Sequence, residues 1–173
     1  YFNIGKLPRE YVPYLSILAN VLGRVDTAKH TYNELNFDKL MNLGGIWFGP
    51  ATYTKYKTLD DYTPLYGIYT KMMSDKTDYA LELAEEIVLT SKLDDKKRLR
   101  DILAEMKSGK RNEIINNGNS VAGARARSYF SKVECYYQDL GGIDFYLFLT
   151  DILDNWDAKA DEFIEKLTAV KNY

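Results

Sequence analysis

Few residues in this sequence have side chains suited to catalysis or metal binding, and His30 is the only histidine. It lies in the polar stretch Lys29-His30-Thr31, with no second histidine and no cysteine at ligand spacing. Zinc in proteins takes three or four protein ligands, so this stretch predicts a surface turn residue rather than a ligand. The sequence therefore predicts neither a metal site nor a catalytic residue, and it identifies no substrate-binding residue.

Cys135 is the only cysteine, which excludes an intramolecular disulfide and a CxxC zinc ribbon and fits a reducing compartment. We expect a cytoplasmic location, with an organelle matrix as the alternative. Cys135 ends a helical pattern beside Tyr136 and Tyr137, and this position favours a buried, inert thiol. A dyad of Cys135 with His30 would require the fold to bring the two together.

The charged residues predict solvated faces rather than sites. The pairs Asp60-Asp61, Glu85-Glu86 and Asp94-Asp95 are adjacent, so their side chains diverge on a helix and cannot share a proton across a substrate. The basic run Lys96 to Arg100 alternates with acidic residues, which favours an exposed helix face with i, i+4 pairing. The net charge of −2 also gives no field to attract nucleic acid or an anionic membrane. No nucleic-acid or membrane partner is expected.

The composition is that of a folded domain of the length expected for one core. The chain has 173 residues, of which 46% are apolar and 28% charged, and it includes fifteen tyrosines, which we expect mostly in core and rim packing. Its longest apolar stretch, Ile143 to Leu149, is far shorter than the ~20 residues that a membrane span requires. We expect residues 1–173 to be a single domain.

Hydrophobic spacing predicts two helices at the start of the chain. From Arg9 to Leu22 the apolar stripe is so wide that the helix should be buried on most of its surface, with Pro13 in its first turn and Gly23 at its end. A second helix is predicted from Tyr32 to Leu43.

Aromatic and β-branched residues then predict an antiparallel hairpin. Its strands are Ile46 to Thr54 and Tyr62 to Met72, and Pro50 indicates a bulge or an edge in the first. Two strands alone are unstable in water, so further strands are expected. One of these is the alternating Tyr1 to Ile4, which resembles the tail of a strand whose beginning is missing.

The remaining residues have helical spacing. Helices are expected around Ala80 to Val88 with Thr77 or Asp78 as cap, around Leu99 to Met106 with Asp94 as cap, and from Ser120 to Val133, Ile143 to Leu153 and Asn155 onward, with a break at Asn116 to Asn119. Small residues at 122–126 suggest close helix packing. The fold class is therefore α+β, with helices packed on an antiparallel sheet.

Two segments resemble a known family. Asn119-Ser-Val-Ala-Gly-Ala-Arg-Ala-Arg-Ser-Tyr-Phe-Ser131 and Gln138-Asp-Leu-Gly-Gly-Ile-Asp-Phe-Tyr-Leu-Phe-Leu149 resemble the associated, non-catalytic third domain of presequence-protease-type peptidases, a branch of the insulinase and pitrilysin zinc metallopeptidases. The similarity continues upstream in order, so it covers nearly the whole chain. The resemblance implies an insulinase-type metallopeptidase domain, derived from a ferredoxin-like half-domain, truncated at the first strand and part of a larger peptidase chain.

The resemblance also implies where the chemistry lies. In that family an H-x-x-E-H helix and a distant Glu of the first domain hold zinc, which activates the water that hydrolyses unstructured peptides. Here the corresponding helix, Arg9 to Leu22, offers Tyr11, Pro13, Tyr14, Ser16 and Ile17 instead. The resemblance implies no cofactor in residues 1–173 and zinc in the catalytic domain of the parent enzyme.

Three further residues match family positions without taking over the family roles. Glu105, in Ala104 to Ser108, resembles the segment of the distant zinc ligand, but without histidine partners a solvated or salt-bridged residue is expected. Arg127 and Tyr129 are not given the carbonyl-stabilising role, which in the family belongs to the final domain.

We therefore expect a non-catalytic domain that forms part of the chamber wall of a zinc metallopeptidase and contacts its other domains as the two halves close on unstructured peptide. Two alternatives remain open. One is a catalytically inactive structural or interaction protein of the same fold, and the other is a free-standing module that binds an extended peptide along an edge such as Ile46 to Tyr53.

Overall fold

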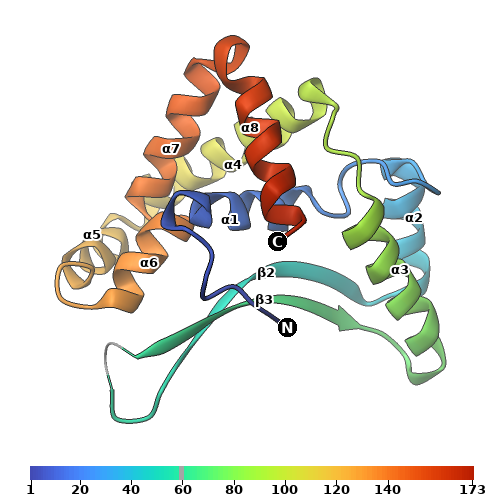
Figure 1. Cartoon of the computed structure of the whole chain (residues 1–173), viewed down its shortest axis with the longest axis horizontal. Helices are drawn as coiled ribbons and strands as arrows, with labels where there is room; N and C mark the ends of the chain where they lie inside the picture. The colour runs from blue at the N-terminus through green and yellow to red at the C-terminus, as the bar shows by residue number, and fades with distance from the viewer. Residues whose placement is uncertain (59–60) are drawn as a thin grey trace.

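In the computed structural model a curved antiparallel sheet lies on one side of a layer of helices, and the structure describes residues 1–58 and 61–173 (Figure 1). This is the α+β class expected from the sequence. The described elements are β1 (Phe2–Asn3), η1 (Arg9–Tyr11), α1 (Val12–Val21), α2 (Tyr32–Asn42), β2 (Gly45–Thr54), β3 (Tyr62–Lys71), η2 (Ser74–Lys76), α3 (Thr77–Thr90), α4 (Lys96–Asn116), α5 (Gly118–Arg127), α6 (Lys132–Gly141), α7 (Ile143–Asp154) and α8 (Trp156–Lys171).

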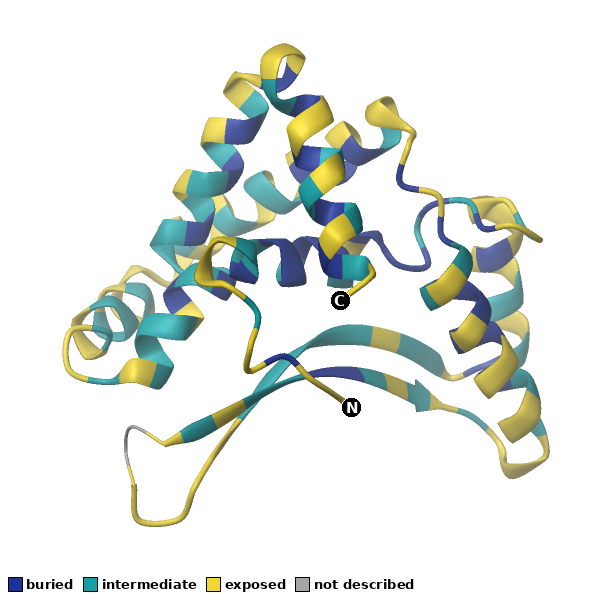
Figure 2. Ribbon diagram, in the orientation of Figure 1, coloured by how far each residue is buried: buried dark blue, intermediate teal, exposed yellow. Residues whose placement is uncertain are grey.

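Helix α1 is the centre of the fold, and it confirms the helix predicted over 9–22. It lies between the sheet and the other helices, where it contacts β2, α6 and α8 (Figure 1). Ile17 and Val21 are fully buried, and Figure 2 shows α1 as mostly buried along its length. Pro13 occupies its first turn, where a missing N–H is tolerated, and Gly23 follows the helix with a positive φ of 74°.

The sheet has the strand order β1-β3-β2, with both pairs antiparallel. The predicted hairpin is confirmed, since β2 and β3 pair in one continuous register from Gly45 opposite Lys71 to Thr54 opposite Tyr62. Pro50 pairs with Tyr66 inside that register, so it marks an edge strand and not a bulge.

The helices after the sheet differ from the predictions mainly at their boundaries. The helix expected from Ser120 to Val133 is wrong, because the chain forms α5 and then α6, which begins after Ser131. The Ser131 side chain accepts a hydrogen bond from the Glu134 N–H, which starts a new helix there. Ser120 lies inside α5, whose residues are all at least partly exposed, so the tight packing suggested by its small residues is absent.

Two other predicted caps are also corrected. Asp95 rather than Asp94 caps α4, because its carboxylate accepts from the Arg98 N–H at 2.9 Å. Helix α3 begins after Lys76 without a side-chain cap, so neither Thr77 nor Asp78 has that role. The break near Asn117 is confirmed, since α4 ends at Asn116 and α5 begins at Gly118.

The buried apolar side chains form one cluster that draws on α1, the α3 and α4 helices, and α7 and α8. Phe163, Leu103 and Leu149 are among its largest fully buried members. The cluster lies on the helix side of the sheet, and none of the described helices packs on the opposite face (Figure 1).

Candidate functional site

The face of the sheet turned away from the helices carries a group of aromatic side chains, here called the aromatic face: Tyr1, Trp47, Tyr53 and Tyr69. Successive residues of a strand point to opposite sides, and Trp47 and Tyr53 share one side of β2. Tyr69 lies directly opposite Trp47 in the register. Trp47 is 53% exposed, whereas the second tryptophan, Trp156, is 6% exposed in the core. Large aromatic side chains are therefore displayed to solvent on this face.

Two glycines allow these rings to lie flat on the strands. A Cβ at Gly67 would lie 2.6 Å from the ring of Tyr69, and a Cβ at Gly45 would overlap the ring of Trp47. The rings therefore cover the backbone of the residue two positions earlier instead of standing away from the sheet.

Tyr1 packs between two of the other rings of the aromatic face. Its ring is edge-on to Tyr69 at 5.6 Å and to Tyr53 at 6.1 Å between centroids. The Tyr53 hydroxyl donates to the Tyr1 hydroxyl at 3.3 Å, and this bond raises the pKa of Tyr53 above its ordinary value. Such a surface can stack on apolar and aromatic side chains of a partner without selecting one sequence.

The sequence analysis missed the aromatic face, because the tyrosines were assigned to core and rim packing. That assignment is confirmed for Tyr14 and Tyr66, which are buried. The signal that was available is the strand alternation, since positions 47 and 53 share one side of a strand whose intervening residues on that side, Gly49 and Ala51, are small.

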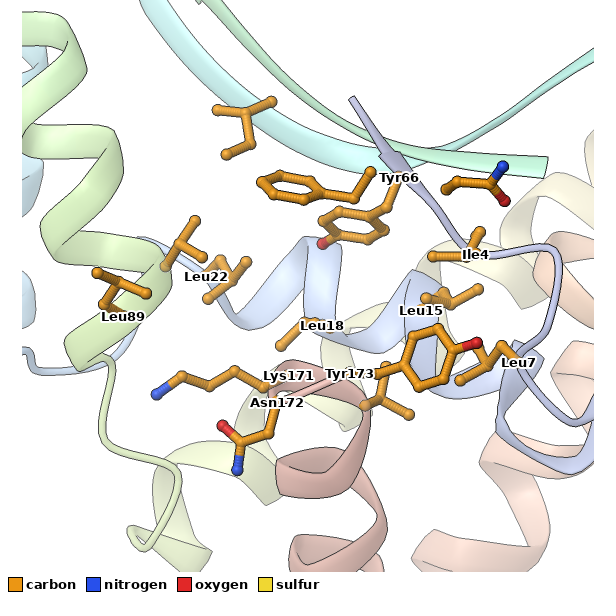
Figure 3. A pocket seen from close by; sticks show the side chains of 15 residues that line it. Ile4, Leu7, Leu15, Leu18, Leu22, Tyr66, Leu89, Lys171, Asn172 and Tyr173 are labelled. Atoms are coloured by element: carbon orange, nitrogen blue, oxygen red, sulfur yellow. The ribbon is translucent and has the colours of Figure 1, made fainter. Parts of the chain in front are cut away.

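On the helix side of the sheet lies an apolar cavity of about 270 Å³, bounded by β1, β3, α1 and the ends of α3 and α8 (Figure 3). The hydroxyl of Tyr66 is buried in this region and has no hydrogen-bond partner among the described residues. Burial raises the pKa of Tyr66 well above its ordinary value, so the group stays protonated and can donate or accept one bond.

His30 has a structural role in place of the ligand role that the sequence argued against. Its Nδ1 donates to Oε1 of Glu86 at 2.8 Å, and the hydroxyl of Thr27 donates to the same oxygen at 2.5 Å. Glu86 is 8% exposed, so the expectation that it lies on a solvated face is wrong. This carboxylate ties the turn before α2 to α3.

Cys135 is half-buried rather than fully buried, which corrects the expected environment of the thiol. It accepts a hydrogen bond from the Arg9 guanidinium at 3.4 Å, and the same guanidinium binds Asp139 at 2.7 Å. His30 contacts Glu86 on α3 instead, so the structure gives the members of the hypothetical Cys135–His30 dyad separate partners.

The residues that matched family positions lie apart from one another. Glu105 forms a salt bridge with Arg24, as expected for a carboxylate without histidine partners. Arg127 pairs with Glu134 at 3.0 Å, and the exposed ring of Tyr129 lies under the guanidinium of Arg125. These contacts are local ion pairs and ring contacts on the helical side of the molecule.

The basic run Lys96 to Arg100 pairs across elements, not within its own helix as predicted. Lys96 binds Asp161 of α8 at 2.7 Å. Arg98 donates to the Arg24 carbonyl at 2.9 Å and covers the ring of Tyr32. The acidic pair Asp60-Asp61 lies partly outside the described residues.

The described part of the chain does not offer the ligands of a zinc centre. No group of three or more His, Cys, Asp or Glu side chains in it is arranged to hold a metal ion. On α1, the positions compared with a zinc helix are occupied by Tyr14 and Ile17, which are buried in the core. We therefore derive no zinc chemistry from these residues. Among the described helices, none is long and apolar enough to cross a membrane.

Comparison with known proteins relates this chain to peptidase sequences. A family of peptidase-associated domains, named for subfamily C of metallopeptidase family 16, matches residues 1–152. Protein HypA of Clostridium perfringens is 32% identical over 152 residues, which cover 88% of this chain and 16% of that protein. The mitochondrial presequence protease of Yarrowia lipolytica is 23% identical over 99% of this chain and 17% of its own length. That of Saccharomyces cerevisiae is 21% identical over 96% and 17%. The chain thus spans about a sixth of the length of these relatives.

Proposed function

Because the chain belongs to this family of peptidase-associated domains, we propose that it is the non-catalytic domain of a zinc metallopeptidase that degrades unstructured peptides. In this proposal residues 1–173 act as one unit, which forms part of the wall of the substrate chamber and of the contact between the two halves of the enzyme. Zinc and all catalytic groups belong to other parts of the parent chain, in a cytoplasmic or organelle-matrix enzyme.

The observation that carries the proposal is the aromatic face. It presents Trp47, Tyr53 and Tyr69 on a sheet whose other side is closed by helices. Contiguous exposed apolar surface marks binding sites on proteins, and aromatic rings offer large contact area at low entropic cost. An unstructured peptide is a ligand that stacked, sequence-tolerant contacts suit, so this face is assigned to the chamber.

A second exposed apolar group supports the contact with neighbouring domains. Ile115, Tyr129 and Phe130 are exposed where α4, α5 and α6 meet, on the helical side of the molecule. Their distance in the fold from the sheet suits a separate role, the packing of this domain on the rest of the peptidase.

The peptide-binding role is tested by titrating the chain with an unfolded, apolar peptide and following tryptophan fluorescence. Trp47 is exposed and Trp156 is buried, so a change in emission reports on the aromatic face. Trp47→Ala should weaken binding about tenfold or more, since loss of one central aromatic anchor costs roughly 1–2 kcal/mol or more. For that variant, binding is followed by calorimetry.

Phe130→Ala is the matched control, because it removes an exposed aromatic ring elsewhere and should leave the affinity unchanged. Equal affinities of Trp47→Ala and the original chain would remove the aromatic face from the proposal. The peptidase assignment is tested separately by the parent reading frame, which is expected to encode an H-x-x-E-H helix upstream of Tyr1. Its absence would favour a catalytically inactive structural protein of the same fold.

A further inference from the structure

The sheet has a free backbone edge along β3, here called the β3 edge, from Gly67 to Lys71 on the side where β1 lies. β1 pairs only with Leu65 and Tyr66. Since the Pro64 carbonyl accepts from the Ile4 N–H next to β1, alternate residues of β3 direct their backbone groups to that side. Ile68 and Thr70 are the next two, and no described strand pairs with them there. Unpaired strand edges are templates for an added strand.

The opposite edge of the sheet is a poorer template. The Lys71 carbonyl accepts from the Gly44 N–H, so the register turns the backbone groups of the even-numbered residues of β2 away from β3. Pro50 is one of these residues and has no N–H to donate. The edge from Ile46 to Tyr53, which the sequence favoured for strand addition, is therefore interrupted at its middle.

An apolar cavity lies on the helix side of the sheet, against the β3 edge. Its volume is about 270 Å³, and Ile68 of the β3 edge is one of its walls. Leu18 and Leu22 of α1 and Leu89 of α3 line it as well, and Figure 3 shows these side chains around an open space. A strand added beside Ile68 would direct every second side chain toward this cavity.

The cavity also contains an unused polar group. Tyr66 is 7% exposed, and its hydroxyl has no hydrogen-bond partner within the described residues. In Figure 3 its ring lies among the apolar side chains of the walls. Buried hydroxyls are nearly always paired, so a ligand that brings a polar atom to this depth satisfies it.

We propose that an extended peptide binds along the β3 edge, in line with β1, and inserts one bulky side chain with a polar tip, such as tyrosine, into the cavity. Its backbone pairs with Ile68 and Thr70, and the tip of its side chain bonds to the Tyr66 hydroxyl. This occupant continues the existing β1–β3 pairing and uses the edge, the cavity and the hydroxyl together, whereas a small apolar molecule uses only the cavity. The inference rests on the proposed function for the ligand class, an unstructured peptide.

The experiment uses two labelled peptides of alternating valine and threonine that differ only at the central residue, tyrosine or phenylalanine. Fluorescence anisotropy measures their affinity for the chain and for Tyr66→Phe. We expect the tyrosine peptide to bind the original chain roughly fivefold to tenfold more tightly, because one buried hydrogen bond is gained. In Tyr66→Phe the two peptides should bind alike. An unchanged ratio in that variant would overturn the proposal.

Backbone pairing is tested on the peptide, so that the fold of the protein is not disturbed. N-methylation of the amides that face β3 should abolish binding, while N-methylation of the alternate amides should have little effect. Binding should also slow hydrogen exchange at the Ile68 and Thr70 amides. Equal binding of the two N-methylated forms, or no protection of these amides, contradicts the proposal.

The same measurements separate this site from the aromatic face. Trp47→Ala alters the opposite side of the sheet and should leave the tyrosine preference unchanged. If Trp47→Ala abolishes binding while Tyr66→Phe does not change the preference, the peptide lies on the aromatic face, and the β3 site is rejected with the proposed function intact. If the preference for tyrosine depends on Tyr66 and Trp47→Ala has no effect on any peptide, the aromatic face is rejected instead.

Discussion

Replacing Glu86 with alanine should destabilise the chain strongly, although the residue stands beside an exposed glutamate of the same helix. Glu86 is 8% exposed and accepts hydrogen bonds from Thr27 at 2.5 Å and from His30 at 2.8 Å. Bonds to a charged acceptor contribute about 1.5–3 kcal/mol each, and part of this is regained when His30 contacts water. The expected loss is about 3 kcal/mol, or about 6–12 °C in melting temperature for a chain of this length.

The assay is thermal and urea unfolding followed by circular dichroism, with Glu85→Ala as the matched control. Glu85 is exposed on the same helix, so its replacement should change stability by less than about 0.5 kcal/mol. A loss below about 1 kcal/mol for Glu86→Ala, or equal losses for the two variants, would refute the view that this carboxylate holds the turn before α2 against α3.

The same carboxylate should give the chain a defined acid sensitivity. Burial acts to raise the pKa of Glu86, but the hydrogen bonds from Thr27 and His30 outweigh it and lower the pKa below the ordinary value of 4.5. A lowered folded-state pKa gives stability that is present above the unfolded pKa and is lost as pH falls through the folded one. The stability difference between the original chain and Glu86→Gln should therefore shrink as pH falls below about 4. A difference that stays constant from about pH 7 to about pH 3 would contradict this.

Three further substitutions probe the core, the cavity and the aromatic face. Leu103→Ala removes a fully buried side chain and should cost about 2–5 kcal/mol in urea unfolding; a cost under about 1 kcal/mol would show a loosely packed core. Tyr66→Phe removes an unpaired hydroxyl and should be neutral or stabilising by up to about 1 kcal/mol, so a clear destabilisation would reveal a partner for it. Gly67→Ala should displace the Tyr69 ring at a cost of about 1 kcal/mol, and Tyr69→Ala should suppress that cost if the ring is its cause.

Local patterns predicted the elements well where burial is continuous. The spacing over 9–22 predicted α1, and its apolar residues are buried in the structure. The alternation and the polar stretch around residues 55–61 predicted the β2–β3 hairpin, although β2 has a regular register through Pro50. These patterns succeed because one buried face imposes its own period on the sequence.

The boundary between α5 and α6 was missed although a local signal existed. Ser131 is followed three residues later by Glu134, the spacing of a capping box, and this serine does cap α6. Small residues at 122–126 were interpreted as close packing, but α5 contains no buried residue. Residue size alone does not say whether another helix lies alongside.

The sequence by itself determined the α+β class, the buried central helix, the hairpin and the resemblance that covers the chain. The tertiary structure alone decided which polar groups meet, because Arg9 and Asp139 or His30 and Glu86 are joined by contacts between segments far apart in the chain. It also decided which face of the sheet is free and which edge is unpaired. A strand pattern reports that one face is buried, but the elements that cover each face and each edge are set by long-range packing.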